Sequence, residues 1–417
     1  MSKPIRLVPP FVADGWWIIV VKKVFTRSEK TAKAPLPQGF ATIWVTVALD
    51  LVGFGIVVPI LGRYAERYGA SGLEVGLLFA SFSLAQLVCA PLLGRLSDRI
   101  GRKPVIMISL LGTAVGSFVT GAAGALWVLF LGRILDGASG ASVAVAQGAV
   151  TDLAPPSERP RLLGLLGAAF GVGFVVGPAL GGLASLGGEH LPFFVAGTVA
   201  LINAGVAWFR LPETRPARVR DEARMHSSHG TSAKIRLWGL ALTGFTAIVA
   251  FSGFEATFSL LAGNRFNLTE GGIAAIFVGI GAVLVVVQGI LIAPINAKLG
   301  TQRSLQIGLV LNSAGLIILA FAESWSILII ALSFLTVGQG LVAPNLSTLV
   351  SGRVPDHRRG EALGFQQGVN AIGRVSGPAL AGILYDHVSI GSPYLVGGAL
   401  CALALLFAVG VGEQESF

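Results

Sequence analysis

Charged side chains are scarce in this sequence: Asp, Glu, Lys and Arg together make up 12% of its 417 residues. That is about half the share found in soluble globular proteins, so the composition excludes a chain of ordinary soluble domains. Hydrophobic residues account for 53%, and the mean hydropathy is +0.77. Apolar runs of about 20 residues, enough to cross roughly 30 Å of hydrocarbon as a helix, recur from Phe40 onward. The sequence therefore predicts an all-α polytopic membrane protein.

Cysteine and histidine are also scarce, which argues against disulfide and metal chemistry. The two cysteines, Cys89 and Cys401, each lie in an apolar run, and the five histidines form no cluster with metal-ligand spacing. We expect both cysteines to be small buried hydrophobic residues, and we predict no metal site and no cofactor. The glycine-rich segment 171–177 lacks the preceding strand that a dinucleotide site needs. The prediction is therefore a protein that is not an enzyme, with a membrane enzyme or receptor without transport as the distant alternative.

Twelve apolar segments are long enough to be membrane-spanning helices. They lie at residues 40–62, 73–94, 104–124, 126–150, 161–186, 191–210, 237–262, 271–295, 304–322, 325–350, 361–385 and 391–411. The longest polar break follows the sixth segment and predicts a linker between two six-helix halves. The predicted organisation is a basic N-terminal extension (1–39), a first half (40–210), a linker (211–236), a second half (237–411) and a short C-terminal tail (412–417).

The N-terminal extension carries a short apolar stretch, residues 16–21, that cannot cross a bilayer. Seven Lys and Arg residues surround it. A Trp pair among basic residues is typical of a segment that lies in the membrane interface and meets anionic lipids. A flexible tail or a misplaced start codon is the alternative.

The formal net charge of +9 is distributed in a way that predicts membrane orientation and not nucleic-acid binding. With the N-terminus inside, 25 of the 30 Lys and Arg residues fall in the inner segments. The outer loops hold three, Arg63, Arg67 and Arg265, and two more lie within predicted spans. We therefore predict a multi-pass protein of the inner cell membrane with both termini in the cytoplasm. It is expected to be a monomer.

The two predicted halves share an internal repeat. Shifted by 200 residues, segment 151–185 is identical to 351–385 at 11 of 35 positions, including Gly-Pro-Ala-Leu at 177–180 and 377–380. Halves related by a parallel repeat place a substrate site near the middle of the membrane between them.

Four motifs carry a resemblance to a known family. The segment "GRLSDRIGRKPVI" (94–106) lies between the second and third spans, and "GRILDGASGA" (132–141) lies in the fourth. The fifth span contains "GVGFVVGPALGG" (171–182), and the first contains "LDLVGFGIVVPIL" (49–61). The motifs resemble those of the major facilitator superfamily, in particular its twelve-helix drug:proton antiporters such as the tetracycline efflux pumps. The resemblance covers residues 40–411 and implies a major facilitator fold and transport by alternating access.

The first of these motifs packs charges of both signs between two apolar runs. The resemblance implies a gating role, in which Asp98 locks the two halves in one state and releases them in the other. Asp98 can accept hydrogen bonds from Arg102 or from a nearby helix N-terminus, and Gly94 would let neighbouring backbones approach. A topology signal with a local ion pair is the alternative. Ala297 stands where the second half would need an equivalent of Asp98, so the predicted lock is asymmetric. The candidate gating residues are Gly94, Asp98, Arg99, Gly101, Arg102 and Lys103.

Glycines at four-residue intervals mark the fifth and eleventh spans. Such spacing permits close contact between membrane helices, and Pro178 removes a backbone hydrogen bond and can bend its helix. We expect both helices to pack closely where the two halves meet. The antiporter motif implied by the resemblance is Gly173, Gly177, Pro178, Gly181 and Gly182, preceded by Gly167 and Gly171 and repeated as Gly373, Gly377, Pro378 and Gly382.

Charged residues inside the spans are functional candidates because an unpaired charge in the membrane is costly. A carboxyl that meets in turn an apolar cavity and a guanidinium can take up a proton on one side and release it on the other. Asp50 is the predicted proton-coupling residue, and Arg133 is its predicted counter-ion. Asp136, three residues after Arg133, could pair with that arginine instead. The alternative for Asp50 is a structural role as the partner of Arg133.

The seventh and eleventh spans supply further candidates. Glu255 is predicted either to select cationic substrates or to act as a second proton site, and nearby phenylalanines offer cation–π surface. The alternative places these aromatics toward lipid and Glu255 near the outer water. Arg374 is predicted to neutralise Glu255, with binding of an anionic group as the alternative. The candidate cavity residues are Phe54, Phe251, Phe254, Glu255, Asn345, Gln366, Asn370 and Arg374.

These residues predict a secondary active transporter that exports small amphipathic compounds or drugs in exchange for protons, as in antibiotic resistance. The third and ninth spans contain no acidic residue, where the tetracycline pumps carry further carboxylates. Tetracycline itself is therefore not the expected substrate. An exporter of metabolites or lipids with the same fold is the alternative.

Overall fold

The secondary structure is helical throughout the part of the chain that the computed structural model describes, residues 36–155, 158–214, 238–354 and 359–410. The predicted interfacial segment at 16–21, most of the linker and the C-terminal tail lie outside the described residues. The chain divides into a unit Met1–Gln38 and a unit Gly39–Phe417, and the helices given below belong to the second unit.

The helices follow the predicted spans closely. In the first half they are α2 (Phe40–Glu66), α3 (Gly72–Ile100), α4 (Arg102–Gly121), α5 (Leu126–Ser139), α6 (Ser142–Leu153), α7 (Arg159–Ser185) and α8 (Leu191–Arg210). In the second half they are α10 (Trp238–Phe266), α11 (Glu270–Val286), the π-helical turn η3 (Val287–Leu291), α12 (Ile292–Leu299), α13 (Thr301–Ala320), α14 (Trp325–Gly352), α15 (Arg359–His387) and α16 (Ser392–Gly410). Each predicted span corresponds to one helix, except that α5 and α6 share the fourth span and α11, η3 and α12 share the eighth.

Eleven helical segments in the described ranges are long and apolar enough to cross a membrane. Such runs become helices in lipid because a helix satisfies every backbone N–H and C=O within the segment. α15 is not among the eleven, although it is 29 residues long, because polar residues interrupt its apolar sequence. It nevertheless packs against α3, α10, α14 and α16. The twelve-helix prediction therefore agrees with the described part of the structure, which has eleven apolar spans and α15, a helix of higher polarity that packs among them.

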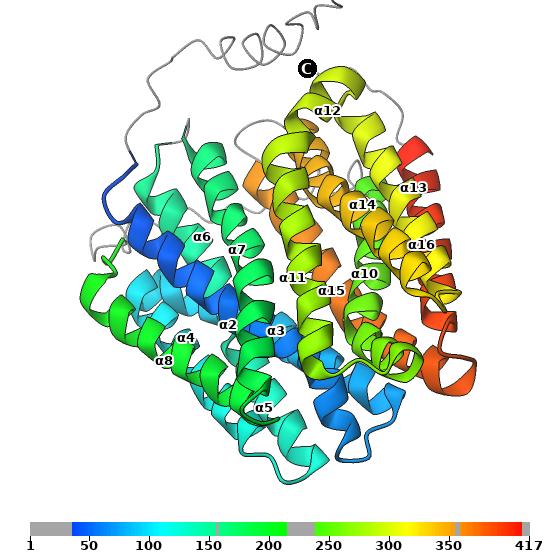
Figure 1. Ribbon diagram of the computed structural model, residues 1–417. Helices are drawn as coiled ribbons and strands as arrows, with labels where there is room; N and C mark the ends of the chain where they lie inside the picture. The colour runs from blue at the N-terminus through cyan, green and yellow to red at the C-terminus, as the bar shows by residue number, and fades with distance from the viewer. Residues whose placement is uncertain (1–35, 156–157, 215–237, 355–358, 411–417) are drawn as a thin grey trace, which may run out of the picture. The chain divides into compact units, whose positions relative to one another are not determined.

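The two halves have the same internal packing (Figure 1). In the first half α2 packs against α7 and α8, while α4 packs against α5 and α8. In the second half α10 packs against α15 and α16, while α13 packs against α14 and α16. Each of these contacts has a counterpart in the other half, as the sequence repeat predicts.

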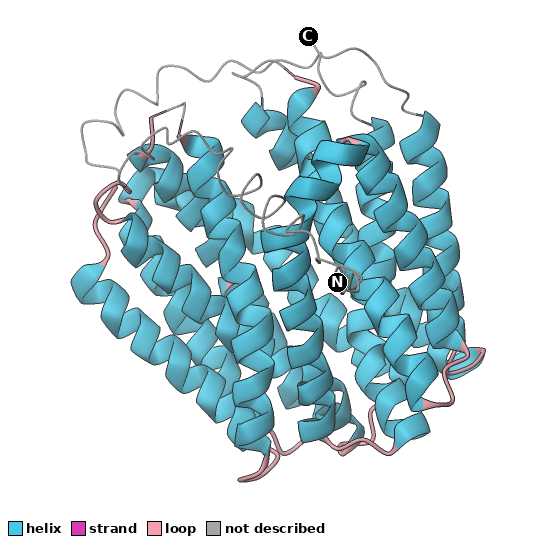
Figure 2. Cartoon of the chain, turned by 45° about the horizontal axis from the view of Figure 1, so that its top comes forward, coloured by secondary structure: helices cyan, strands magenta, loops and turns pink. Residues whose placement is uncertain are grey.

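The halves meet mainly along two pairs of helices, α7 with α11 and α3 with α15, and α2 also contacts α10 and α11. Figure 2 shows the two groups of helices side by side, with short loops between successive helices of a group. These four helices are the predicted second, fifth, eighth and eleventh spans. The glycine-rich fifth and eleventh spans therefore do lie where the halves meet.

The fourth span, predicted as one helix over residues 126–150, is interrupted. α5 ends at Ser139 and α6 begins at Ser142. The backbone amides between them donate to carbonyls two or three residues earlier, so the regular helical ladder is lost. Gln86 of α3 donates its side-chain amide to the carbonyl of Gly140 at 2.7 Å. A neighbouring helix thus satisfies part of the broken backbone, which is the condition for irregular backbone inside a membrane.

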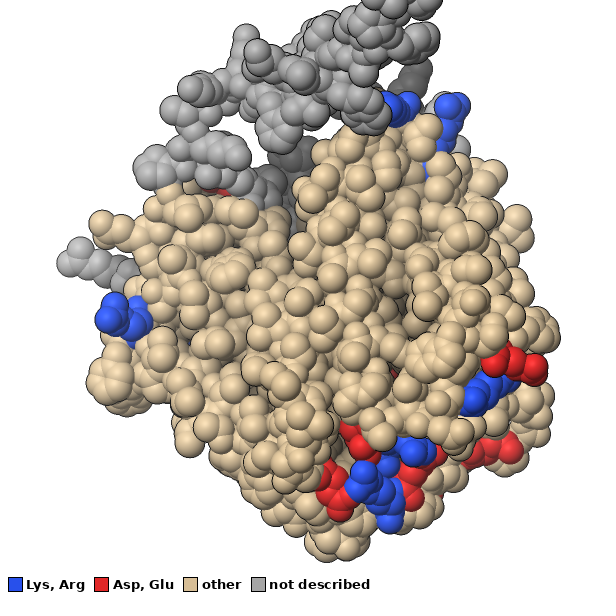
Figure 3. Space-filling view, viewed as in Figure 1, with Lys and Arg blue, Asp and Glu red and all other residues tan. Residues whose placement is uncertain are grey.

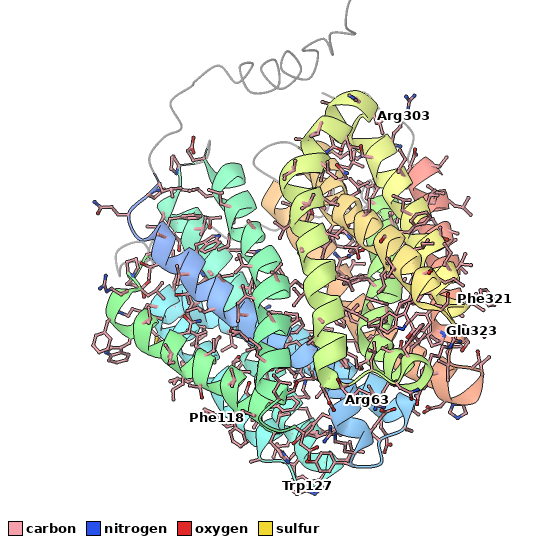
Figure 4. All side chains as sticks on the ribbon, viewed as in Figure 1. Arg63, Phe118, Trp127, Arg303, Phe321 and Glu323 are labelled. Atoms are coloured by element: carbon pink, nitrogen blue, oxygen red, sulfur yellow. The ribbon has the colours of Figure 1, made fainter. Side chains whose placement is uncertain are left out.

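Charged side chains gather at the ends of the helices. On the face shown in Figure 3 they lie in small groups at the borders, and the broad area between them is uncharged. We call the end where α8 finishes and α10 begins the linker end; it carries Arg303. We call the other end, which carries Arg63 and Trp127, the opposite end (Figure 4).

Candidate proton and substrate sites

Asp50 lies within α2 and faces the start of α6. The hydroxyl of Ser142 donates a hydrogen bond to its carboxylate. Ser142 is the first residue of α6 and is 3% exposed. The break in the fourth span therefore brings both a hydroxyl donor and the partial positive charge of a helix N-terminus to the Asp50 carboxylate.

Arg133 pairs with Asp136, its neighbour on the same helix. Their nitrogen and oxygen atoms are 2.8 Å apart, and Arg133 is 2% exposed. The guanidinium carbon also lies 4.2 Å from the centre of the Phe82 ring, and Asp136 has a second partner in Thr113 of α4. Of the two partners that the sequence allowed for Arg133, the structure selects Asp136, and Asp50 is bound by Ser142 instead.

The two acids and the arginine belong to one electrostatic site. Asp136 is close enough to Asp50 to interact with it electrostatically. Asp50, Asp136 and Arg133 together carry a net charge of about −1 when both carboxyl groups are ionised, and about zero when one of them holds a proton. This charge arrangement allows the site to bind and release one proton without leaving a large net charge in the membrane.

Sequence reasoning missed Ser142. The available signal was the small-residue run "SGAS" (139–142), in which Gly140 weakens the helix at a position now seen to be broken. Glycine is so frequent in this chain that the run did not stand out from the others.

In the second half the structure brings Glu255 of α10 near Arg374 of α15. The two half-buried side chains interact electrostatically, although no direct salt bridge joins them. Glu255 lies eleven residues before the end of α10 at Phe266, which corresponds to about 16 Å along the helix. This depth argues against the alternative that placed Glu255 near the outer water.

The aromatic candidates fall into two groups. Phe54 packs 5.8 Å from Phe82 and so belongs to the surroundings of Arg133. Phe251 and Phe254 pack together at 6.0 Å, with Phe251 half-buried and Phe254 only 2% exposed. Phe251 is therefore the more accessible of the two beside Glu255.

The amide candidates each bond to another side-chain amide. The amide of Asn296 donates to Asn345 at 2.7 Å, and Asn345 is fully buried. Gln366 donates to Asn370 at 2.9 Å along α15, with Gln366 4% exposed and Asn370 half-buried. In this conformation Asn345 bridges helices, and Asn370 is more exposed than Gln366.

The candidate gating residues belong to a charge network at the linker end of the first half. Arg102 lies 3.0 Å from Asp98 and 2.9 Å from Asp152, near the end of α6. It also donates to the hydroxyl of Ser97 at 2.7 Å. The predicted pairing of Asp98 with Arg102 is therefore present, and it ties α3, α4 and α6 together.

The N-terminus of α4 is capped by the first residues of the linker. Glu213 accepts hydrogen bonds from the backbone N–H groups of Arg102 at 2.9 Å and of Lys103 at 3.2 Å. Gly101 has a φ of 111°, and a Cβ there would collide with the Glu213 carboxylate. The expected role of Gly94 is wrong for this structure, because no atom lies within 4 Å of a Cβ built on it. Arg99 is exposed near the end of α3.

The antiporter motif faces two neighbours. Within α7, Gly173 and Gly177 are pressed against α2, and a Cβ on Gly177 would lie 2.6 Å from the Cα of Gly55. The same close approach continues at Gly181, whereas Gly182 faces Ala274 of α11 in the other half. The helix also contains Pro178, and the preceding Gly171 lies beside Val285. Gly167 has no neighbour within 4 Å, so its expected close contact is not made.

The repeated motif in α15 behaves in the same way. Gly373 and Gly377 face α10, where a Cβ on Gly377 would lie 2.5 Å from the carbonyl oxygen of Val249. Gly382 faces α3 in the other half, next to the carbonyl of Gly72. The predicted close packing of both glycine-rich helices is therefore observed.

Two repeated six-helix halves, with carboxylates and arginines inside their spans, define a secondary transporter. The chain belongs to the Major Facilitator Superfamily, whose sequence model matches residues 43–306 and 287–415.

Relatives of known name are efflux and resistance proteins. The chain is 31% identical to the tetracycline resistance protein, class E, of Escherichia coli, over 87% of this chain and 92% of that protein. It is 29% identical to multidrug resistance protein 2 of Bacillus subtilis, over 88% of this chain and 93% of that one.

Solved structures share the fold. The crystal structure of the human organic anion transporter MFSD10 (TETRAN) superposes with a TM-score of 0.69 at 24% identity, over 89% of this chain and 98% of that one. The nucleoside transporter NupG superposes with a TM-score of 0.71 at 12% identity, over 90% of this chain and all of that one. At these identities the likeness establishes the fold alone.

Proposed function

We propose that this protein exports small amphipathic compounds, including drugs, in exchange for protons. The observation that carries the proposal is the group around the broken fourth span, where Asp50, bonded by Ser142, interacts with the Asp136 carboxylate that pairs with the buried arginine of α5. A protein without proton coupling would have little reason to keep two carboxyls and one guanidinium inside the membrane.

The exchange follows from alternating access. A proton and a substrate must bias the same two-state equilibrium in opposite directions, because a ligand shifts an equilibrium only by its differential affinity. Protonation of the Asp50 site removes its negative charge, and deprotonation restores a carboxylate held by Ser142. Asp50 is the proposed proton carrier, with Arg133 and Asp136 setting its electrostatic surroundings.

The substrate class rests on the relatives and on the second half. The names of the relatives point to tetracycline and to multiple drugs. However, α4 and α13 contain no acidic residue, so tetracycline is not the proposed substrate. Glu255 with Phe251 beside it suits an amphipathic organic cation, and Arg374 would hold Glu255 in place until such a cation arrives.

We propose that the linker end faces the cytoplasm, that the protein lies in the cell membrane and that it acts as a monomer. The distribution of Lys and Arg along the chain supports this orientation. The basic N-terminal extension is the proposed contact with anionic lipids.

The test uses purified protein in liposomes with a trapped pH dye and an imposed proton gradient. Amphipathic cations, neutral drugs and anions are added in turn to the parent protein and to Asp50→Asn. We expect a cation to dissipate the gradient in the parent and at least tenfold more slowly in the variant. The matched control is Glu323→Gln, which changes an exposed carboxyl at the opposite end.

Each result has a definite meaning. If Asp50→Asn moves protons as fast as the parent, Asp50 is structural and Glu255 becomes the next carrier to test. If no compound moves protons through the parent, the antiport proposal fails, and an uncoupled exporter of metabolites or lipids takes its place.

A further inference from the structure

At the opposite end, a carboxylate of the second half caps a helix of the first half. Asp386, near the end of α15, accepts hydrogen bonds from the backbone N–H groups of Gly72 at 2.8 Å and Leu73 at 2.6 Å. These are the first two residues of α3. A carboxylate is favoured there because the free N–H groups and the helix dipole both present positive charge.

The contact is closely fitted. A Cβ on Gly72 would lie 2.6 Å from the Asp386 carboxylate and 2.7 Å from the ring of Tyr385. One turn further along α3, a Cβ on Gly76 would collide with the carbonyl of Pro378. Asn264 of α10 donates to the Tyr385 hydroxyl at 2.7 Å and so helps to hold that ring. The end of α15 is therefore shaped to receive the start of α3.

A second charged contact joins the halves at the same end. Arg67, the residue that follows α2, pairs with Glu270, the first residue of α11. It also pairs with Glu189 in the loop between α7 and α8. All three side chains are partly exposed, at 42%, 20% and 35%. Arg67 therefore bridges a carboxylate of its own half and one of the other half.

These contacts are suited to being broken and remade. α3 carries its own capping box, in which Ser71 accepts from the N–H of Glu74 and Glu74 accepts from the N–H of Ser71. The start of α3 therefore keeps part of its capping when Asp386 leaves. Asp386 is exposed, so water can reach the separated groups. The same bonds placed at mid-membrane would leave unsatisfied groups in an apolar environment.

We propose that Asp386 and Arg67 form a releasable gate that holds the opposite end closed and so sets the balance between the two states of the transporter. The proposal rests on the proposed transport function for its purpose, but its geometry does not depend on proton coupling. Loss of either contact favours separation of α3 from α15 and of α2 from α11. The opposite end then opens more often.

The experiment follows the opening of that end directly. The reporter is Ala274→Cys, in a background where Cys89 and Cys401 are replaced by serine and alanine. Ala274 is 1% exposed and lies between the halves next to Gly182. Its cysteine should react with a polar thiol reagent only when the opposite end opens. Labelling rates are measured on purified protein in lipid nanodiscs.

We expect Asp386→Ala and Arg67→Gln each to speed labelling about five- to tenfold, the population change expected for losing one helix cap or one charged contact. Gly72→Ala should act in the same direction, because its Cβ displaces the Asp386 carboxylate without removing a charge. Asp386→Asn keeps the shape and one acceptor, so a smaller increase is expected. The matched control is Glu323→Gln, which removes the charge of an exposed carboxyl at the same end, in the loop between α13 and α14.

The proposal is overturned if Asp386→Ala and Gly72→Ala both label at the parent rate in monodisperse protein. It is equally overturned if Glu323→Gln accelerates labelling as much as they do. Labelling needs neither a proton gradient nor a substrate. A labelling shift without proton exchange would therefore refute the antiport and leave the gate standing. Proton exchange without a labelling shift would refute the gate and leave the antiport standing.

Discussion

At the scale of single residues, the most informative contact is the hydrogen bond from Ser142 to Asp50. The candidate status of Asp50 could be predicted from the sequence, because a carboxylate in an apolar run needs a reason to be there. Its partner could not be predicted, because the contact joins positions 92 residues apart and depends on a helix break. A charge in a span reveals that a partner exists, but only the packing identifies it.

Replacing Ser142 with alanine should slow proton exchange about tenfold while leaving the amount of folded protein unchanged. The change removes one hydrogen bond to a carboxylate, and bonds to charged groups are worth roughly 1.5–3 kcal/mol. The rate is measured in the same liposome assay. The matched control is Thr151→Ala, because the Thr151 hydroxyl in the same helix bonds to its own helix backbone at 2.7 Å. Equal rates in both variants would contradict a role for Ser142 at the proton site.

At the scale of helices, sequence patterns predicted which helices pack closely better than they predicted whether a span forms one unbroken helix. The glycine spacing of the fifth and eleventh spans indicated close packing, and α7 does press against α2 through Gly173 and Gly177. The break between α5 and α6 was not predicted, because hydropathy measures burial in lipid and not the regularity of the backbone. Gly94 shows that a motif can also mispredict a contact. We expected a close backbone approach at this glycine, but no atom lies within 4 Å of a Cβ built on it.

The glycine contact between α7 and α2 makes a stability prediction. Gly177→Ala would place a methyl group 2.6 Å from the Cα of Gly55, so the helices must move apart. We expect a loss of about 1–3 kcal/mol, the usual cost of overpacking, seen as a lower melting temperature in detergent. The control is Gly164→Ala on the same helix, where no atom lies within 4 Å. That variant should melt with the parent protein or slightly above it; a drop as large as that of Gly177→Ala would contradict the packing argument.

At the scale of the whole molecule, the repeat predicted the architecture. Eleven identities between 151–185 and 351–385 were enough to identify α7 and α15 as equivalent helices of the two halves. The other helices of the two halves correspond in the same order. The sequence also predicted the asymmetry between the halves, but not that Asp152 would be a second partner of Arg102. The first half has a charge network around Arg102, whereas Ala297 stands where the second half would need the equivalent of Asp98.

The proposed orientation can be checked with two exposed positions at the two ends. In a background free of cysteine, Glu323→Cys should react with a membrane-impermeant thiol reagent added to intact cells. Arg303→Cys should react only after the cells are permeabilised, because the linker end is proposed to face the cytoplasm. The reverse pattern would place the linker end outside and would invert the direction of transport. Labelling of both residues before permeabilisation would contradict a single orientation.

The polar character of α15 has a consequence for how the protein is made. This helix carries Arg374 and several amides, and by composition it is the one predicted span that is not apolar enough to count as a membrane helix. A segment of that kind gains little from entering lipid by itself, so its insertion must draw on the helices that cover its polar side. Since α3 and α10 are synthesised first, they can receive α15 as it leaves the ribosome. Biogenesis and tertiary packing are therefore coupled at this helix, and mutations that loosen its neighbours should lower the yield of correctly inserted protein before they affect transport.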